Sequence, residues 1–174
     1  GILIPGGFGN RGISGKIEAI RHARENQIPF LGICLGMQLS IIEFTKNVLK
    51  MKNSGSSEFG KHTNNVISLM TEWSKKNQKV KRTKENDLGA TMRLGSYPCY
   101  IKDKSLASKV YKKKLIHERH RHRYEVNPKY RSSIEKKGLV FSGFSKDKKL
   151  LEIIENKYHK WVLGVQFHPE LKSK

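Results

Sequence analysis

A cysteine flanked by glycines is the residue of this 174-residue chain whose setting best suits chemistry. It occurs as Gly32-Ile33-Cys34-Leu35-Gly36, after an apolar run typical of a buried strand. The apolar residues that follow recur at helical spacing: Met37, Ile41, Phe44 and Val48. This pattern predicts a nucleophile elbow, a tight turn between strand and helix whose helix N-terminus favours a thiolate. The alternative is a buried structural cysteine in a glycine-rich turn.

A histidine and a glutamate near the end of the chain supply what a nucleophilic thiol needs. A β-prone run over 161–167 stops at His168-Pro169-Glu170, because proline cannot donate a ladder hydrogen bond. In extended geometry His168 and Glu170 point to the same side. An imidazole base needs a third group that fixes its tautomer, and a carboxylate provides it. We therefore predict Cys34 as nucleophile, His168 as base and Glu170 as the orienting group; a surface His–Glu pair is the alternative.

A glycine-rich loop follows the first predicted strand, residues 1–4. Its sequence is Pro5-Gly6-Gly7-Phe8-Gly9-Asn10-Arg11-Gly12, and a helix is expected to begin near Ser14. Such a loop brings backbone N–H groups close to a ligand, as a phosphate site or an oxyanion hole. It lacks the G-K-[ST] ending and the G-x-G-x-x-G spacing of phosphate loops. We therefore predict an oxyanion hole built from the amides of Gly7 and Leu35, which indicates acyl-transfer chemistry.

Six motifs, in order along the chain, carry a family resemblance. Residues 5–9, 32–38 and 166–170 together resemble the class I (triad-type) glutamine amidotransferases. Three further stretches, 11–12, 89–95 and 118–127, resemble the glutaminase domains of the CTP synthase family. The resemblance spans nearly the whole chain and is weak only over about residues 60–86.

The resemblance implies an enzyme that hydrolyses the side-chain amide of L-glutamine. Cys34 would form a γ-glutamyl thioester, His168 would shuttle protons, and Glu170 would orient the imidazole. Gln38 and Glu58 would bind the amino-acid end of glutamine, with Glu58 at its ammonium. The implied glutamine-binding set is Gly7, Phe8 (which would cover the pocket), Leu35, Gly36, Met37, Gln38, Glu58 and Arg123.

The resemblance also implies partners outside this chain. An amino-terminal synthetase (ligase) domain, absent here, would use ATP, UTP and magnesium and would receive the ammonia, within a homotetrameric full enzyme. No cofactor and no metal are expected in this domain. GTP is the expected effector, acting through a lid over about residues 71–87 in which Arg82 would couple effector to catalysis; a solvated arginine is the alternative. Residues 1–174 are expected to be one glutaminase domain, amino-terminally incomplete, because earlier strands are needed to cover both faces of the sheet.

Length and composition narrow the setting. The chain suits one domain with a sizeable core, and it has no apolar run long enough to span a membrane. Cys34 and Cys99 make no disulfide framework, and a thiolate nucleophile favours a reducing, cytoplasmic compartment. Cys99 lacks glycine neighbours and is interpreted as a strand or loop cysteine without chemistry.

The order of predicted elements indicates an α/β protein. Strand, helix, strand and helix follow one another to about residue 49, a pattern typical of parallel strands. Residues 50–60 are expected to be a loop. Further strands are expected at 66–70, 92–101, 140–144, 150–154 and 161–167, with short helices at 106–111 and 130–136. The resemblance implies a flavodoxin-like open, mostly parallel sheet with helices on both faces.

The formal net charge of +20 suggests a nucleic-acid partner at first sight. The lysines are spread along the chain, however, and no nucleic-acid-binding motif accompanies them, so a solvated surface is the interpretation, with no nucleic acid and no membrane as partners. The run Arg119 to Tyr124 belongs to a family motif, so Arg123 is predicted in the pocket, with Arg119 and Arg121 facing a partner domain. Alternatives that remain open are another class I amidotransferase, a γ-glutamyl peptidase of the same fold, and a basic nucleic-acid-binding module on an inactive glutaminase scaffold.

Overall fold

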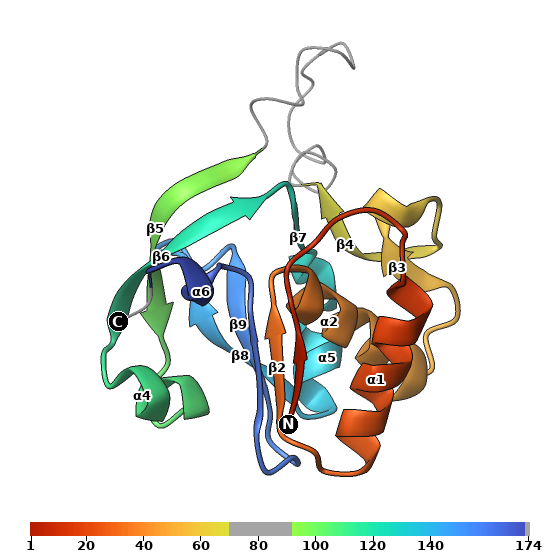
Figure 1. The fold of residues 1–174 in the computed structure, drawn as a ribbon, viewed down its shortest axis with the longest axis horizontal. Helices are drawn as coiled ribbons and strands as arrows, with labels where there is room; N and C mark the ends of the chain where they lie inside the picture. The colour runs from red at the N-terminus through yellow and green to blue at the C-terminus, as the bar shows by residue number, and fades with distance from the viewer. Residues whose placement is uncertain (70–91, 173–174) are drawn as a thin grey trace.

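Two sheets organise the chain in the computed structural model, which describes residues 1–69 and 92–172 (Figure 1). The large sheet has the order β1 (Ile2–Ile4), β2 (Phe30–Ile33), β10 (Val162–Val165), β9 (Leu151–Asn156), β8 (Leu139–Phe144), β5 (Arg93–Ile101) and β6 (Leu115–His122). The small sheet has the order β3 (Ser54–Ser56), β4 (Asn64–Leu69) and β7 (Tyr124–Val126).

The large sheet is mixed. Strands β1, β2 and β10 are parallel neighbours, whereas the pairings β10–β9, β9–β8, β8–β5 and β5–β6 are antiparallel. The α/β class is confirmed, and the expectation of a mostly parallel sheet is wrong for the described strands. Short connections between β-prone segments, such as the turn between β8 and β9, suit antiparallel pairs, whereas a parallel pair needs a long crossover.

Helices pack on both faces of the large sheet. The main ones are α1 (Ile13–Glu25) and α2 (Leu35–Asn47), which pack on each other, with α2 also against β1, β2 and β10. The short α5 (Arg131–Lys136), preceded by the 3-10 turn η2 (Pro128–Tyr130), joins the same core through Ile134. The short α4 (Leu106–Tyr111) covers part of the opposite face, where Ala107 packs with Cys99 and Val165.

Helix α2 is buried on every side, because it lies between the large sheet, α1 and the small sheet (Figure 1). All residues from Leu35 to Thr45 are buried, so burial extends beyond the apolar residues Met37, Ile41 and Phe44 that recur at helical spacing. The polar members of this helix find partners inside the protein. Glu43, for example, is 1% exposed and pairs with Arg24 of α1 at 2.8 Å.

Three of the described strands, β3, β6 and β7, were not predicted from the sequence. Strands β6 and β7 occupy the Arg/His run, where β6 alternates between exposed and buried residues. Glu118, His120 and His122 face inward, and the arginines between them face outward. The loop expected over 50–60 contains the short β3 and the 3-10 turn η1 (Ser57–Phe59). The proposed lid, Arg82 and motif residues 89–91 lie outside the described residues.

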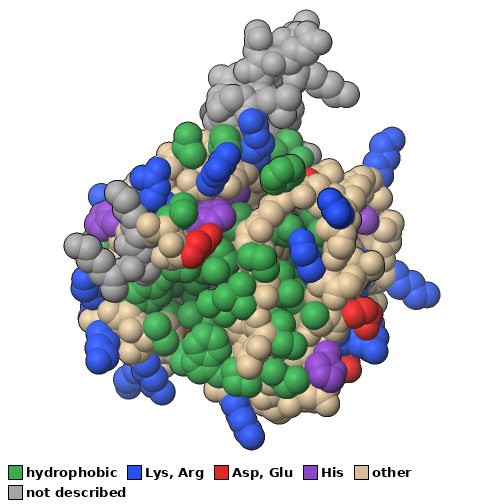
Figure 2. Space-filling view, viewed as in Figure 1, with side chains coloured by type: hydrophobic (Ala, Val, Ile, Leu, Met, Phe, Trp, Pro, Cys, Tyr) green, Lys and Arg blue, Asp and Glu red, His purple; other side chains and the backbone are tan. Residues whose placement is uncertain are grey.

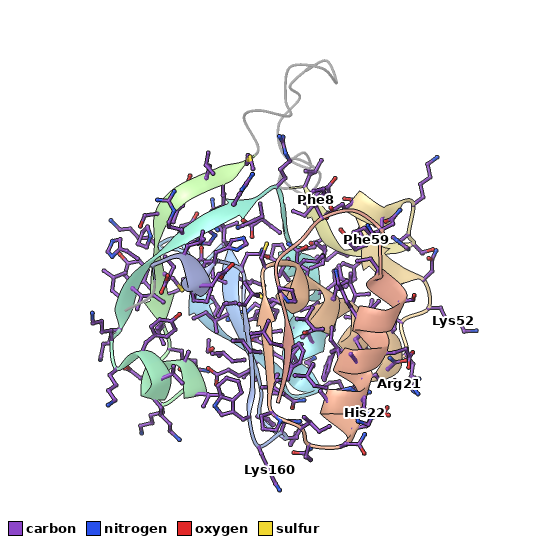
Figure 3. The ribbon with its side chains drawn as sticks, viewed as in Figure 1. Phe8, Arg21, His22, Lys52, Phe59 and Lys160 are labelled. Atoms are coloured by element: carbon purple, nitrogen blue, oxygen red, sulfur yellow. The ribbon has the colours of Figure 1, made fainter. Side chains whose placement is uncertain are left out.

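The charged side chains are dispersed over the surface. Exposed side chains such as Lys52, at the right of the view, and Lys160, at its bottom, project outward from different sides of the domain (Figure 3). On the face shown in Figure 2, basic side chains surround a central apolar area, which fits a solvated basic surface. Leu3, on the edge strand β1, is 55% exposed. Among the described residues, no helix is long and apolar enough to cross a membrane.

Candidate active site

Cys34 lies at the junction of β2 and α2 in a strained backbone conformation. Its φ of 50° and ψ of −101° are unusual for a residue with a side chain, as expected of a nucleophile elbow. The Cys34 N–H donates to the Val165 carbonyl at 2.7 Å, which fixes the turn to the end of β10. A Cβ atom on Gly36 would overlap the Ile4 carbonyl oxygen, so the first turn of α2 can approach β1 only with glycine there. The elbow predicted from the glycine pattern is confirmed.

Burial dominates the acidity of the Cys34 thiol. The residue is 4% exposed, and desolvation raises the pKa of Cys34 to about 12. A hydrogen bond from the Leu35 amide opposes this rise in pKa, while the carboxylates Glu125, Glu58 and Glu170 add to it. The helix N-terminus therefore supplies a donor to the sulfur, as predicted, but burial outweighs it. The sulfur rests as a thiol and needs a base.

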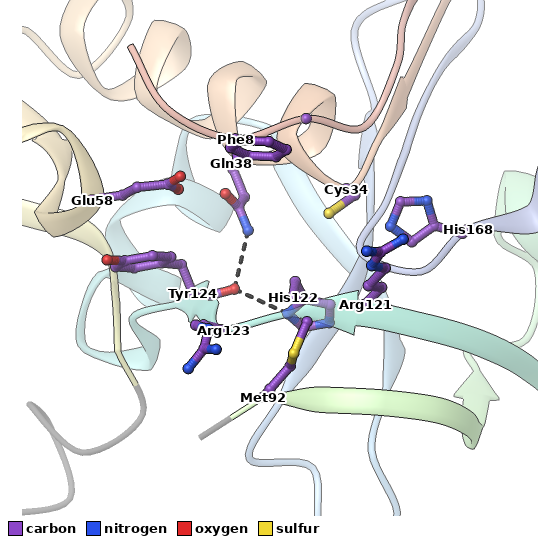
Figure 4. Close-up of a pocket in the computed structure, with 11 residues that line it drawn as sticks. Phe8, Cys34, Gln38, Glu58, Met92, Arg121, His122, Arg123, Tyr124 and His168 are labelled. Carbon is purple, nitrogen blue, oxygen red and sulfur yellow. Dashed lines mark hydrogen bonds between the residues drawn. The ribbon is translucent and has the colours of Figure 1, made fainter. Parts of the chain in front are cut away.

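His168 is held from both its backbone and its ring. Its N–H donates to the Arg119 carbonyl of β6 at 2.8 Å, and its ring Nδ1 lies 2.7 Å from Glu170 Oε1. A carboxylate only accepts, so Nδ1 carries the hydrogen. Nε2 is buried without a partner among the described residues, and Figure 4 shows this ring beside Cys34. The predicted pair is present, with the base's second nitrogen available to the thiol.

The predicted reason for the His168–Glu170 pairing needs correction. Strand β10 ends at Val165, and residues Pro169–Lys172 form the helical turn α6. The carboxylate therefore reaches the imidazole by folding back from a helical turn, not along an extended strand. Proline suits the first position of such a turn, because its missing N–H has no helical partner there.

Gly6 lies close to both the nucleophile and the base. A Cβ atom on Gly6 would lie 2.7 Å from Cε1 of His168 and 3.7 Å from Cβ of Cys34. Any side chain at this position would enter the space between the two groups. The glycine loop thus approaches Cys34 and His168 closely, as an oxyanion loop requires.

A pocket of about 510 Å³ opens above these residues (Figure 4). It is lined by Gly7, Phe8, Cys34, Gln38, Glu58, Met92, Arg121, His122, Arg123, Tyr124 and His168. Glu58 stands at its side wall and also accepts the Gly9 N–H at 2.9 Å, which ties the glycine loop to η1. Phe8 lies at the rim and is 90% exposed. The structure thus brings together five predicted glutamine-binding residues: Gly7, Phe8, Gln38, Glu58 and Arg123.

The other predicted contacts lie behind the pocket lining. The side chains of Leu35 and Met37 are buried in the first turn of α2, at 1% and 0% exposure, beside Gly36. For these residues only the backbone is suited to meet a ligand. Met92, Arg121, His122 and Tyr124 line the pocket without having been predicted there, and Arg121 had been expected to face a partner domain. Arg93 pairs with His122 in the β5–β6 register, so Met92, which precedes Arg93, lies at the same end of these strands as His122.

Gln38 has a fixed orientation. Its Nε2 donates to the Tyr124 carbonyl at 3.0 Å and to Gln166 Oε1 at 3.2 Å, which uses both of its hydrogens. The oxygen Oε1 is then the atom left for a ligand, and Figure 4 shows it on the side of Glu58. The Gln38 oxygen and the Glu58 carboxylate, two acceptors, therefore face the same part of the pocket. Arg123 contributes a buried Nη1 without a partner among the described residues, which suits a carboxylate.

Two neutral histidines lie beneath the pocket. His122 Nδ1 is 3.1 Å from the Tyr124 carbonyl, so it carries the hydrogen and its Nε2 accepts from His120 Nδ1 at 2.8 Å. Burial and the charge of Arg93 lower the pKa of His120 to about 2 and that of His122 to about 3. Both rings are therefore neutral at pH 7.

A buried arginine sits below the histidines. Arg93 pairs with Glu125 at 3.2 Å and with Glu152 at 2.8 Å, and all three side chains are nearly inaccessible. Burial raises the pKa of Glu125 to about 7, and Arg93 limits that rise. This cluster anchors β5, β7 and β9 beneath the pocket floor.

The family model described as "Glutamine amidotransferase class-I" matches residues 1–174. The CTP synthase of Pelagibacter ubique is 63% identical over 174 residues, which is 100% of this chain and 32% of that protein. The CTP synthase of Rhodospirillum rubrum is 53% identical over the same length, again 32% of that protein. The chain thus spans about a third of the length of these relatives.

A solved structure is also similar. The glutaminase domain of Trypanosoma brucei CTPS with bound acivicin superposes with a TM-score of 0.87 and 39% sequence identity. The match covers 99% of this chain and 64% of that one.

Proposed function

Because the chain belongs to the class-I glutamine amidotransferase family, we propose that it is the glutaminase part of a CTP synthase and releases ammonia from L-glutamine. The observation that carries this proposal is one pocket that holds Cys34, Glu58, Arg123 and His168, whose ring is in turn paired with Glu170. A nucleophile and its base occupy one side, and groups complementary to a zwitterion occupy the other.

The amino-acid end of glutamine determines how the substrate is oriented in the pocket. Its ammonium would meet the carboxylate of Glu58 and the oxygen of Gln38, and its carboxylate would meet Arg123. Phe8 is placed at the rim to cover the bound side chain. The carboxamide then lies toward Cys34 and the glycine loop.

The reaction proceeds as an acyl transfer. His168 Nε2 takes the thiol proton as Cys34 Sγ attacks the amide carbon, and the amides of Gly7 and Leu35 hold the developing oxyanion. His168 returns the proton to the leaving nitrogen, which departs as ammonia, and a γ-glutamyl thioester remains. Water, deprotonated by His168, hydrolyses the thioester to glutamate. Glu170 stabilises the imidazolium in both stages.

The ammonia would pass to a synthetase domain that aminates UTP to CTP. ATP, UTP and magnesium are assigned to that domain because the similar proteins are CTP synthases of which this chain covers about a third. The chain spans 64% of a solved glutaminase domain, so we also propose that further glutaminase segments pack on the edge strand β1, beside Leu3.

Labelling with diazo-oxo-norleucine, an electrophile that mimics glutamine, tests the glutaminase. In the intact protein that carries this chain, stoichiometric modification of Cys34, prevented by glutamine, is expected. The Cys34→Ser variant should lose both labelling and glutamine-dependent CTP formation while it keeps ammonia-dependent CTP formation. Cys99→Ser is the matched control, because Cys99 is buried in β5 away from the pocket. No labelling of Cys34, or glutamine use by Cys34→Ser, would contradict the proposal.

A further inference from the structure

A buried carboxamide lies behind the nucleophile. The parallel register pairs Val165 with Ile33, so the next residues along the two strands, Gln166 and Cys34, are neighbours. Gln166 is 0% exposed, and its backbone N–H donates to the Glu152 carbonyl at 2.8 Å. Its side-chain Nε2 lies 3.7 Å from Cys34 Sγ, within hydrogen-bonding distance for sulfur. Gln166 is outside the pocket lining, so it meets the sulfur from the side away from the substrate.

A chain of donors determines which end of this carboxamide faces the sulfur. The Tyr124 carbonyl can only accept, so Gln38 turns its Nε2 toward it. The second hydrogen of that nitrogen is directed at Gln166 Oε1. Since the Gln166 oxygen is engaged there, the end of Gln166 that faces Cys34 is its donor. The Tyr124 carbonyl therefore determines how the carboxamides of both Gln38 and Gln166 are oriented.

We propose that Gln166 is a further catalytic residue, whose side-chain N–H stabilises the Cys34 thiolate during the attack on the substrate. This inference rests on the proposed glutaminase function. Gln166 exchanges no proton: the thiol proton goes to His168 Nε2, and the negative charge left on Sγ is stabilised by the Gln166 donor and, until the oxyanion forms, by the Leu35 amide.

The sulfur needs such help because its surroundings oppose a charge. Desolvation raises the pKa of Cys34, and carboxylates near the site raise it further. A hydrogen bond to a charged acceptor is stronger than one to a neutral acceptor, so an N–H at Sγ favours the thiolate over the thiol. The donor chain also holds Gln166 in place before the substrate binds, so little reorganisation is required during the reaction.

The test is the pH dependence of Cys34 alkylation by iodoacetamide, followed by mass spectrometry of the Cys34 peptide in the intact protein. Gln166→Met removes the donor at similar side-chain length. Loss of one charge-assisted hydrogen bond should raise the apparent pKa of Cys34 by about one unit and slow its alkylation about tenfold below that pKa. In glutamine hydrolysis, kcat should fall about tenfold or more with little change in KM. An unchanged pH profile would overturn the proposal.

A second variant and a control keep this test specific. Gln166→Glu retains an oxygen for Gln38 but places an acceptor at the sulfur, so the apparent pKa of Cys34 should rise at least as far as in Gln166→Met. A pH profile of alkylation equal to that of the parent contradicts the proposal.

The control is Thr45→Val, which removes a buried hydroxyl elsewhere on α2. This hydroxyl donates to the Ile42 carbonyl, and its loss should leave the pH profile of Cys34 alkylation unchanged. A shift there as large as in Gln166→Met would assign the effect to general loosening of α2. Alkylation does not require turnover, so a protein that fails to hydrolyse glutamine can still support or contradict the role of Gln166.

Discussion

The ring nitrogen Nδ1 of His168 lies 2.7 Å from Glu170 Oε1, yet the two residues differ in exposure: the imidazole is 14% exposed and the carboxylate 47%. The base is thus enclosed while its partner stays hydrated. A hydrated carboxylate remains ionised at low cost, and the short hydrogen bond still orients the ring.

Glu170→Gln is expected to lower kcat for glutamine with little change in KM. The amide of the variant keeps the shape of the carboxylate, but it carries no charge to stabilise the imidazolium, and it can present an N–H that imposes the wrong tautomer. A fall of about 10²–10⁴-fold is expected from comparable losses. Steady-state kinetics measures it, with Glu135→Gln in α5 as the control, since Glu135 pairs with Arg131 away from the pocket. A parental kcat in Glu170→Gln would remove Glu170 from the mechanism.

Glu58→Gln should weaken glutamine binding and spare the thiol. The amide oxygen can still accept the Gly9 N–H, so the glycine loop keeps its tether, whereas the charge that faces the substrate ammonium is lost. KM should rise about 10–100-fold, the range for one hydrogen bond to a charged group. Alkylation of Cys34 by iodoacetamide, which carries no ammonium, should not slow and should if anything quicken, because the Glu58 carboxylate raises the pKa of Cys34. Glu18→Gln, on the exposed side of α1, is the control. An unchanged KM would exclude Glu58 from substrate binding.

Arg93→Met should destabilise the fold strongly. The substitution leaves Glu125 and Glu152 buried without their cation, a situation that costs about 3–5 kcal/mol. Chemical denaturation followed by circular dichroism measures the change in the free energy of unfolding. Lys114→Met is the matched control, because Lys114 pairs with Asp103 at 3.1 Å on the surface, with 82% and 66% of the two side chains exposed, and little change is expected. Equal losses in the two variants would show that the buried cluster adds no special stability.

Mild acid should destabilise the protein through His120 and His122. Their pKa values in the folded state are about 2 and about 3, below the ordinary 6.5, so the stability they contribute is present above pH 6.5 and is lost as pH falls toward the folded values. Glu125, with a raised pKa of about 7, acts in the opposite sense, since its contribution is present below 4.5 and is lost as pH rises through 7.

Removing one histidine should reduce this acid sensitivity. In His120→Gln, the slope of unfolding free energy against pH below 6.5 should decrease by about 1.4 kcal/mol per pH unit, the value for one proton. His117→Gln changes an exposed histidine of the same strand and should retain the parental slope. If His120→Gln also retains it, His120 is already protonated in the folded protein.

The sequence predicted the elements that carry a strong local signal. The strand–helix–strand–helix beginning, the elbow at Cys34 and the helix over 106–111 follow from apolar spacing and glycine placement, and the structure confirms them. The strand β6 was missed, because its buried positions hold Glu118, His120 and His122 in place of apolar residues. Their neighbours come from another strand: His120 packs edge-on against Tyr97 of β5, and His122 pairs in register with Arg93.

The residue types of the site could be predicted from the sequence, but the orientations of their side chains could not. The family resemblance implied Gln38 as a glutamine-binding residue, but which of its atoms faces the pocket depends on the Tyr124 carbonyl, 86 residues away in the chain. The same holds for Gln166, which belongs to a recognised motif but acquires its donor orientation from Gln38. A hydrogen-bond chain across distant segments has no signature in a single sequence.

The hydrogen bond from the His168 N–H to the Arg119 carbonyl attaches the catalytic base to strand β6. The same segment that anchors the base continues four residues later to Arg123, whose guanidinium faces the pocket. A displacement of β6 along its length would therefore move the base His168 and the substrate-binding residue Arg123 together. A contact that shifted this strand would therefore affect substrate binding and turnover together, because both His168 and Arg123 are connected to it.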